Sequence, residues 1–162
     1  MKKTITTIFI DAANLHKGVE SLKWKLDYQR FSVWLKEKYK ADNIYLFIGL
    51  IAKYKDLYTY LQESGYTLIF KETVFDHNGK VKGNCDADLV LHAVQGYYEK
   101  KYTKCLLVTS DGDFSSLVKF LIGKKVFHTL ISPAKQNRCS ILLKRLNVPI
   151  VFLNDIRQKV SK

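Results

Sequence analysis

Four aspartates stand where two apolar segments end and where a helical segment begins. Asp11 directly follows the first apolar run, and Asp111 and Asp113 follow a later run that ends near Val108. Asp86 opens a segment with helical periodicity. Carboxylates that converge repel one another unless a cation neutralises them, and oxygen-rich ligand sets suit Mg²⁺ or Mn²⁺. The pattern therefore predicts a divalent-metal site that can activate water and orient a phosphate.

Two acids lie at the start of the helical segment, and a helical wheel distinguishes between them. With about 100° between successive residues, Leu89 and Ala93 fall within about 80° of Asp86. Asp88 falls on the opposite side of the wheel, together with His92. We therefore expect Asp86 to face the sheet and the metal site, and Asp88 and His92 to face away from the sheet.

Each acid also has a structural alternative. Asp11 or Asn14 could cap the helix after the first strand, Asp113 could cap the helix near Phe114, and Asp86 could complement its helix dipole. Capping alone does not require acids at the ends of two strands and an inward acid on a third element. Their joint placement favours the metal site.

Apolar runs of strand length alternate with helix-periodic segments along almost the whole chain. We predict strands over residues 5–10, 44–48, 67–70, 105–109, 126–131 and 150–153, and helices near 14–22, 28–40, 53–64, 86–101, 114–122 and 137–146. This order predicts an α/β fold, a three-layer α/β/α sandwich with a mainly parallel central sheet, in one domain over residues 1–162. Ligands of such sheets bind beyond the carboxyl ends of the strands, which is where the acids stand.

Lysine and arginine clearly outnumber the acidic residues. The chain has 27 Lys and Arg against 15 Asp and Glu, a formal net charge of +12. This excess favours polyanionic partners, nucleic acid first and anionic membrane second, although a solvated lysine-rich surface would have the same charge. No basic amphipathic helix and no apolar run of roughly 20 residues is present, so we expect no membrane partner.

The cysteines and the amino terminus favour a cytoplasmic location. Cys85, Cys105 and Cys139 are odd in number and lack a C-x-x-C spacing, which is typical of reduced thiols. The apolar run before Asp11 is too short for a secretory signal and is better interpreted as a strand.

Basic residues lie close to the acids in sequence. Lys17 follows the first motif, Lys82 precedes Asp86, and Lys135 and Arg138 follow the fifth predicted strand. We expect these side chains to contact RNA phosphates, helped by backbone donors of a helix that starts near Asn137. Some tyrosines could stack on bases, but helical spacing favours packing roles for those at 54, 58, 60, 97 and 98.

Three segments and the closing part of the chain resemble a known family. They are Phe9–Leu15 (FIDAANL), Lys82–Leu89 (KGNCDADL), Val108–Phe114 (VTSDGDF) and, near the end, Phe152–Ile156 (FLNDI). In this order they resemble the motifs of the NYN domains, in the LabA-like branch of the PIN-like nuclease superfamily.

The resemblance implies a PIN-like fold, a bound divalent metal and single-stranded RNA as the substrate of a hydrolytic ribonuclease. By position, Asp11, Asp86, Asp111 and Asp113 would be metal ligands or their water-mediated partners and would carry the catalysis. Asn14 and Ser110 would orient the site or a phosphate. A homo-oligomer and a protein partner both stay open.

One departure keeps a second function in view. The family pattern often has another acid six residues after the first one in the middle helix, and His92 stands there. A non-catalytic RNA-binding or adaptor domain with the same fold is therefore the alternative. A phosphatase with a nucleophilic Asp11 is disfavoured, because the second acid of that chemistry would stand at Ala13.

Overall fold

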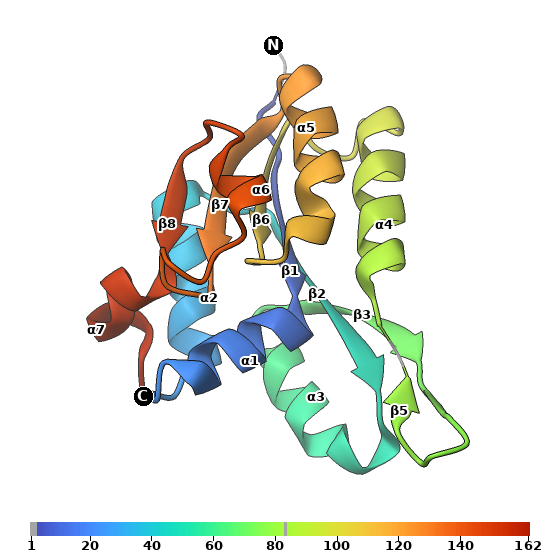
Figure 1. Ribbon diagram of the computed structural model, residues 1–162. Helices are drawn as coiled ribbons and strands as arrows, with labels where there is room; N and C mark the ends of the chain where they lie inside the picture. Colours follow the sequence, from blue (N-terminus) through green and yellow to red (C-terminus); the bar gives the residue numbers. More distant parts are fainter. Residues whose placement is uncertain (1–2, 83) are drawn as a thin grey trace.

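Six parallel strands form the central sheet of the computed structural model, which describes residues 3–82 and 84–162 (Figure 1). The strand order is β3-β2-β1-β6-β7-β8, and every neighbouring pair is parallel. The strands are β1 (Thr6–Asp11), β2 (Asn43–Leu50), β3 (Thr67–Glu72), β6 (Lys104–Val108), β7 (Phe127–Ser132) and β8 (Ile150–Phe152). The predicted α/β fold with a parallel sheet is confirmed.

The direction in which strands are added reverses between β1 and β6. The chain runs from β1 through β2 to β3 at one edge, and then from β6 through β7 to β8 at the other. Such a reversal leaves a crevice beyond the carboxyl ends of the two central strands. Asp11 is the last residue of β1, and Asp111 follows shortly after the end of β6. The topology therefore brings these two acids to the same crevice.

Helices cover both faces of the sheet (Figure 1). One apolar core receives side chains from α1 (Ala12–Ser21), α2 (Tyr28–Tyr39), α3 (Lys55–Glu63) and α7 (Arg157–Val160). The other receives side chains from α4 (Asp86–Tyr98), α5 (Ser115–Gly123) and α6 (Ile141–Lys144). The 3₁₀ helices are η1 (Ala52–Tyr54), η2 (Gly112–Phe114) and η3 (Leu153–Ile156). Within the described residues, no helix combines the length and apolarity needed to cross a membrane.

The strand β1 is buried along its whole length. Ile8 and Ile10 pack into the core of α1 and α2, whereas Phe9 packs into the core of α4 and α5. Successive side chains of a strand point to opposite faces, so the apolar residues Ile8, Phe9 and Ile10 serve the cores on both faces of the sheet. Asp11 therefore stands at the end of a strand that is packed on both faces.

The predicted helix over residues 137–146 is wrong in its extent. The helix α6 covers only Ile141–Lys144, and the segment before it is a loop. The backbone N–H groups of Arg138 and Cys139 both donate to Lys135 O, which closes a turn, and Ser140 has extended backbone angles. The Ser140 hydroxyl then accepts from Leu142 N and caps the short helix. Among the described residues, the nearest helix to begin after Asn137 is α6 at Ile141, so Asn137 itself opens no helix.

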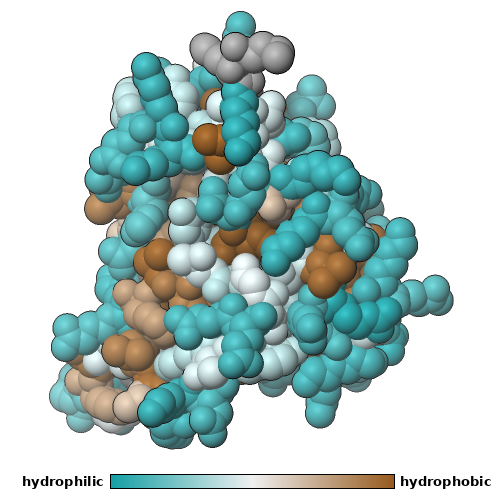
Figure 2. All heavy atoms as spheres, turned by 180° about the vertical axis from the view of Figure 1, so that it is seen from behind, coloured by the Kyte–Doolittle hydropathy of each residue, from teal (hydrophilic) through white to brown (hydrophobic). Residues whose placement is uncertain are grey.

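A β-hairpin between β3 and α4 was not predicted. It pairs β4 (Val74–Phe75) with β5 (Val81–Lys82), and its turn is closed by Asp76 Oδ1, which accepts from Asn78 N and Lys80 N. Gly79 has a φ of 78°, the left-handed conformation that glycine tolerates best. The rear face shows hydrophobic side chains gathered in this region, near the edge strand β3 (Figure 2). Those exposed there are Leu50, Phe70, Val74 and Phe75.

Candidate metal centre and the adjoining basic pocket

Asp11 connects the end of β1 to the start of α1. Its Oδ1 accepts a hydrogen bond from Asn14 N at 3.3 Å, so the expected capping role is present. Its Oδ2 accepts from the hydroxyl of Thr109 at 3.4 Å. The side chain is 6% exposed, and this burial raises its pKa to about 6, with the charges of Asp86 and Asp111 adding to the rise. Asp11 therefore caps α1 and lies close enough to Asp86 and Asp111 for their charges to raise its pKa.

Three further carboxylates converge beyond the end of β6. Asp86, Asp111 and Asp113 each offer an oxygen, and these oxygens all lie within 4.8 Å of one another. Asp111 opens η2, where its Oδ1 accepts from Asp113 N at 2.9 Å. Asp86 lies in the first turn of α4, and its N–H donates to Asn84 Oδ1 at 2.7 Å. The structure thus brings three of the four predicted acids within 4.8 Å of one another, and Asp11 stays outside this group, although the charges of Asp86 and Asp111 act on it.

The donor set fits a hard divalent cation. Every candidate ligand atom is a carboxylate oxygen, the type that Mg²⁺ and Mn²⁺ prefer. The pKa of Asp86 is raised by partial burial and by the neighbouring charges of Asp111 and Asp113. This repulsion is the electrostatic condition that a bound cation relieves.

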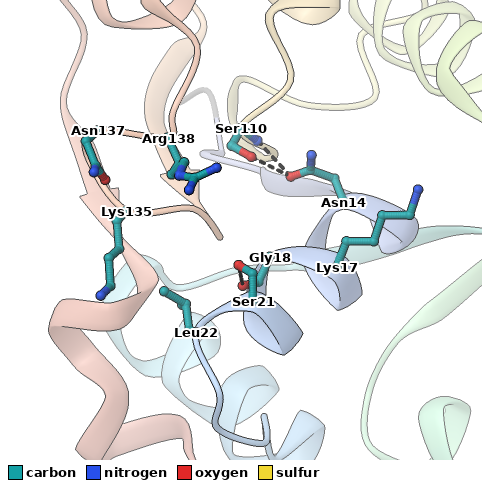
Figure 3. Close-up of a pocket in the computed structure, with 9 residues that line it drawn as sticks. All are labelled: Asn14, Lys17, Gly18, Ser21, Leu22, Ser110, Lys135, Asn137 and Arg138. Atoms are coloured by element: carbon teal, nitrogen blue, oxygen red, sulfur yellow. Dashed lines mark hydrogen bonds between the residues drawn. The ribbon is translucent and has the colours of Figure 1, made fainter.

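A hydrogen-bonded bridge joins the two strand ends that carry the acids (Figure 3). The side-chain oxygen of Asn14 accepts from the backbone N–H of Ser110 at 2.9 Å and from its hydroxyl at 3.0 Å. Below it, the buried Thr109 donates to Asp11 and accepts from Asp111 N at 3.2 Å. Sequence reasoning missed Thr109, although a polar residue at the end of an apolar strand is a usable signal.

A pocket of about 520 Å³ lies between α1, Ser110 and the loop after β7 (Figure 3). Asn14 and Ser110 line it, and Ser110 directly precedes Asp111 in the chain. Three of the four predicted phosphate contacts, Lys17, Lys135 and Arg138, line it. The fourth, Lys82, belongs to β5, and its side chain lies outside the described part of the chain.

The two other polar residues near the start of α4 take different positions. Asp88 lies away from the cluster, with its Oδ2 3.4 Å from Lys71 Nζ on β3. The expectation that His92 faces away from the sheet is wrong, because its exposed ring packs edge-on against Phe47 of β2 with centroids 5.3 Å apart. The buried face of α4 centres on Leu89 and Ala93, so Asp86 and His92 flank that face on either side.

The tyrosines have mainly structural surroundings. The hydroxyl of Tyr58 donates to Gly49 O and accepts from Ile51 N, which fixes the loop after β2. Tyr97 and Tyr98 pack with Phe120 at the far end of α4, roughly 17 Å from its first residue. They are therefore remote from the acids.

A sequence model of the NYN domain matches residues 5–145. The chain belongs to the NYN domain family. NYN domains are PIN-like nucleases, which places the acids of this NYN domain in a nuclease fold. A protein of unknown function from Vibrio parahaemolyticus has a similar crystal structure, with a TM-score of 0.78, 20% identity and coverage of 100% of each chain. That likeness concerns the fold alone. No match to the chain was found among curated proteins.

Proposed function

We propose that this NYN domain is a metal-dependent ribonuclease of the LabA-like branch that hydrolyses phosphodiester bonds of single-stranded RNA. The observation that carries the proposal is the convergence of Asp86, Asp111 and Asp113, whose oxygens lie within 4.8 Å of one another. The net charge of +12 supports a polyanionic substrate. The reduced state expected for buried Cys105 and Cys139 suits a cytoplasmic enzyme.

Four acids would share the work at the site. Asp86, Asp111 and Asp113 would hold Mg²⁺ or Mn²⁺, and Asp11 would do so directly or through water. The bound ion would supply a water of lowered pKa and neutralise charge on the scissile phosphate. Asn14 and Ser110 would keep the two strand ends at a fixed separation, since their two hydrogen bonds join them. In the net reaction the water oxygen bonds to phosphorus, and the leaving oxygen departs with a proton.

The α4 helix offers a matched pair of variants to test the site. Asp86→Asn removes a carboxylate of the cluster, whereas Asp88→Asn removes one that pairs with Lys71. We expect Mn²⁺-dependent cleavage of an unstructured RNA by the wild type and Asp88→Asn. Asp86→Asn should lose about a hundredfold or more in rate, as for lost electrostatic stabilisation of a transition state. Cleavage that persists in chelator, or equally in both variants, would falsify the proposal.

His92 favours one alternative, a domain that binds RNA without cutting it. Where the family pattern often has an acid, this ring packs against Phe47 and supplies no carboxylate. The same cleavage experiment decides between the two functions. Salt-dependent RNA binding with no product in Mg²⁺, Mn²⁺ or other divalent metals would favour the binding domain.

A further inference from the structure

The basic pocket holds three cations that have no acidic partner. Within residues 3–82 and 84–162, the ion pairs are His16–Glu20 and Lys71–Asp88, so Lys17, Lys135 and Arg138 are unpaired. In the part of the chain that the structure describes, no carboxylate lines this pocket. Unpaired cations around a cavity attract an anion of matching size, and the guanidinium of arginine binds phosphate or carboxylate through two parallel hydrogen bonds.

Close packing of α1 against the loop after β7 shapes the pocket. A methyl group on Gly18 would lie 2.5 Å from Pro133 Cβ, so the helix and the loop are in contact at this point. Gly18 lines the pocket, as do residues of both segments. Its volume of about 520 Å³ falls in the range of sites for small ligands. The cavity is therefore large enough for a nucleotide as well as for its phosphate.

A second pocket of about 490 Å³ continues from the first. Lys135 and Asn137 line both, so they stand between them. The second pocket has mixed charge, with Lys144 and Asp155, and it presents the half-buried ring of Phe152. Aromatic rings beside weakly charged surfaces suit stacking with a base more than phosphate binding.

We propose that the two pockets are successive nucleotide subsites for an unpaired RNA strand on one side of the scissile phosphate. Beside the acidic cluster, the first subsite binds a nucleotide whose phosphate contacts Arg138 and Lys135. The second receives the next base against Phe152. Stacked and paired bases of a duplex cannot enter separate cavities, so the substrate is single-stranded at these positions. This inference rests on the proposed function for the place of the scissile phosphate.

Binding is tested without metal, so that cleavage plays no part. The ¹⁵N-labelled wild type in chelator is titrated with 5′-UMP, with uridine and with the dinucleotide pUpU, and the amide shifts are followed. We expect 5′-UMP to shift signals of Asn14, Gly18 and Ser110, and uridine to bind more weakly. We expect pUpU to bind more tightly and to shift Phe152 and Asn154 as well.

Two variants decide which residues bind. Arg138→Ala should weaken binding of 5′-UMP about tenfold, the scale of one lost charge-assisted hydrogen bond. Lys101→Ala removes an exposed charge after the distant end of α4 and should stay within about twofold of the wild type. The amide spectrum of each variant shows whether the fold is kept.

The outcomes separate the subsites from the nuclease. Shifts outside the two pockets, or equal effects of the two variants, would overturn the inference even if the protein cleaves RNA. Shifts in the first pocket alone with pUpU would overturn the second subsite. If the nucleotides bind as expected but no divalent metal supports cleavage, the proposed nuclease is overturned and the two pockets remain RNA-binding subsites.

Discussion

The side-chain oxygen of Asn14 accepts two hydrogen bonds from Ser110, one from the backbone N–H and one from the hydroxyl. The two residues are 96 positions apart in the chain. Because Asn14 follows β1 and Ser110 follows β6, this bridge fixes the separation of the two strand ends on which the acids stand.

The Asn14–Ser110 bridge predicts a graded loss of stability. Asn14→Ala leaves the Ser110 N–H without its partner and should lower the free energy of unfolding by about 1–3 kcal/mol. Ser110→Ala removes one of the two hydrogen bonds and should cost about 0.5–1.5 kcal/mol. Urea denaturation of both variants measures this, and a larger cost for Ser110→Ala would contradict it.

The buried Asp11 predicts that the metal-free protein loses stability as the pH rises. Its pKa is raised from 3.8 to about 6, so between these values the folded state holds a proton that the unfolded state has lost. The stabilisation is complete below the unfolded pKa and is lost as the pH rises through the folded pKa. The loss is about 3 kcal/mol for a shift of this size.

Urea denaturation in chelator from pH 4 to 7 tests the Asp11 prediction. Asp11→Asn should flatten the pH dependence of the free energy of unfolding, because the amide does not titrate in this range. The chelator ensures that the loss of a candidate metal ligand does not affect the comparison. A wild-type profile that rises from pH 4 to 7, or an unchanged slope in Asp11→Asn, would show that another group controls stability.

Metal binding should stabilise the folded state through the acidic cluster. At a concentration a hundred times its dissociation constant, a ligand adds about 2.7 kcal/mol, which corresponds to a rise in Tm of roughly 5–10 °C for a chain of this size. We expect Mn²⁺ to produce such a rise in the wild type and in Asp88→Asn. In Asp111→Asn the rise should be small; an equal rise in all three proteins would place the ion elsewhere.

The contact between Gly18 and Pro133 predicts that the pocket tolerates no side chain at position 18. Alanine favours the helix by about 1 kcal/mol, but a methyl group 2.5 Å from Pro133 Cβ forces α1 away from the loop. Overpacking of this kind costs about 1–3 kcal/mol. Gly18→Ala should therefore lower Tm and weaken RNA binding in chelator. Gly123→Ala is the control, since among the described residues no atom outside the local helix backbone and the two chain neighbours lies within 4 Å of the added methyl group; it should lower neither.

Much of the fold follows from local patterns that the sequence displays directly. The central parts of β1 and β6 are continuous apolar runs, as expected for strands covered on both faces. Asp11 and Asp111 could be assigned to one crevice because all carboxyl ends of parallel strands lie at the same edge. The strand order itself had to come from the structure, since periodicity does not specify which strands pair.

The parts that were missed depend on tertiary contacts or on turn chemistry. His92 was placed on the wrong side because an ideal wheel centred on Asp86 differs from the face that α4 buries around Leu89 and Ala93. The helix expected from Asn137 is prevented by the turn that closes on Lys135 O. The missed hairpin turn at Asn78 and Gly79 could have been predicted from the sequence, because an Asn-Gly pair is typical of tight turns.

The position of β6 beside β1 also has a consequence for synthesis on the ribosome. Asp11 leaves the ribosome about a hundred residues before its partners Asp111 and Asp113, and pairing of β1 with β6 is what brings them together. A nascent chain that has not yet reached β6 contains Asp11 but lacks the acids that follow β6, and it also lacks Ser110 and Arg138. While the ribosome makes the residues between Asp11 and Asp111, the nascent polypeptide therefore lacks a complete centre, and it lies beside ribosomal RNA, a substrate of the class proposed above.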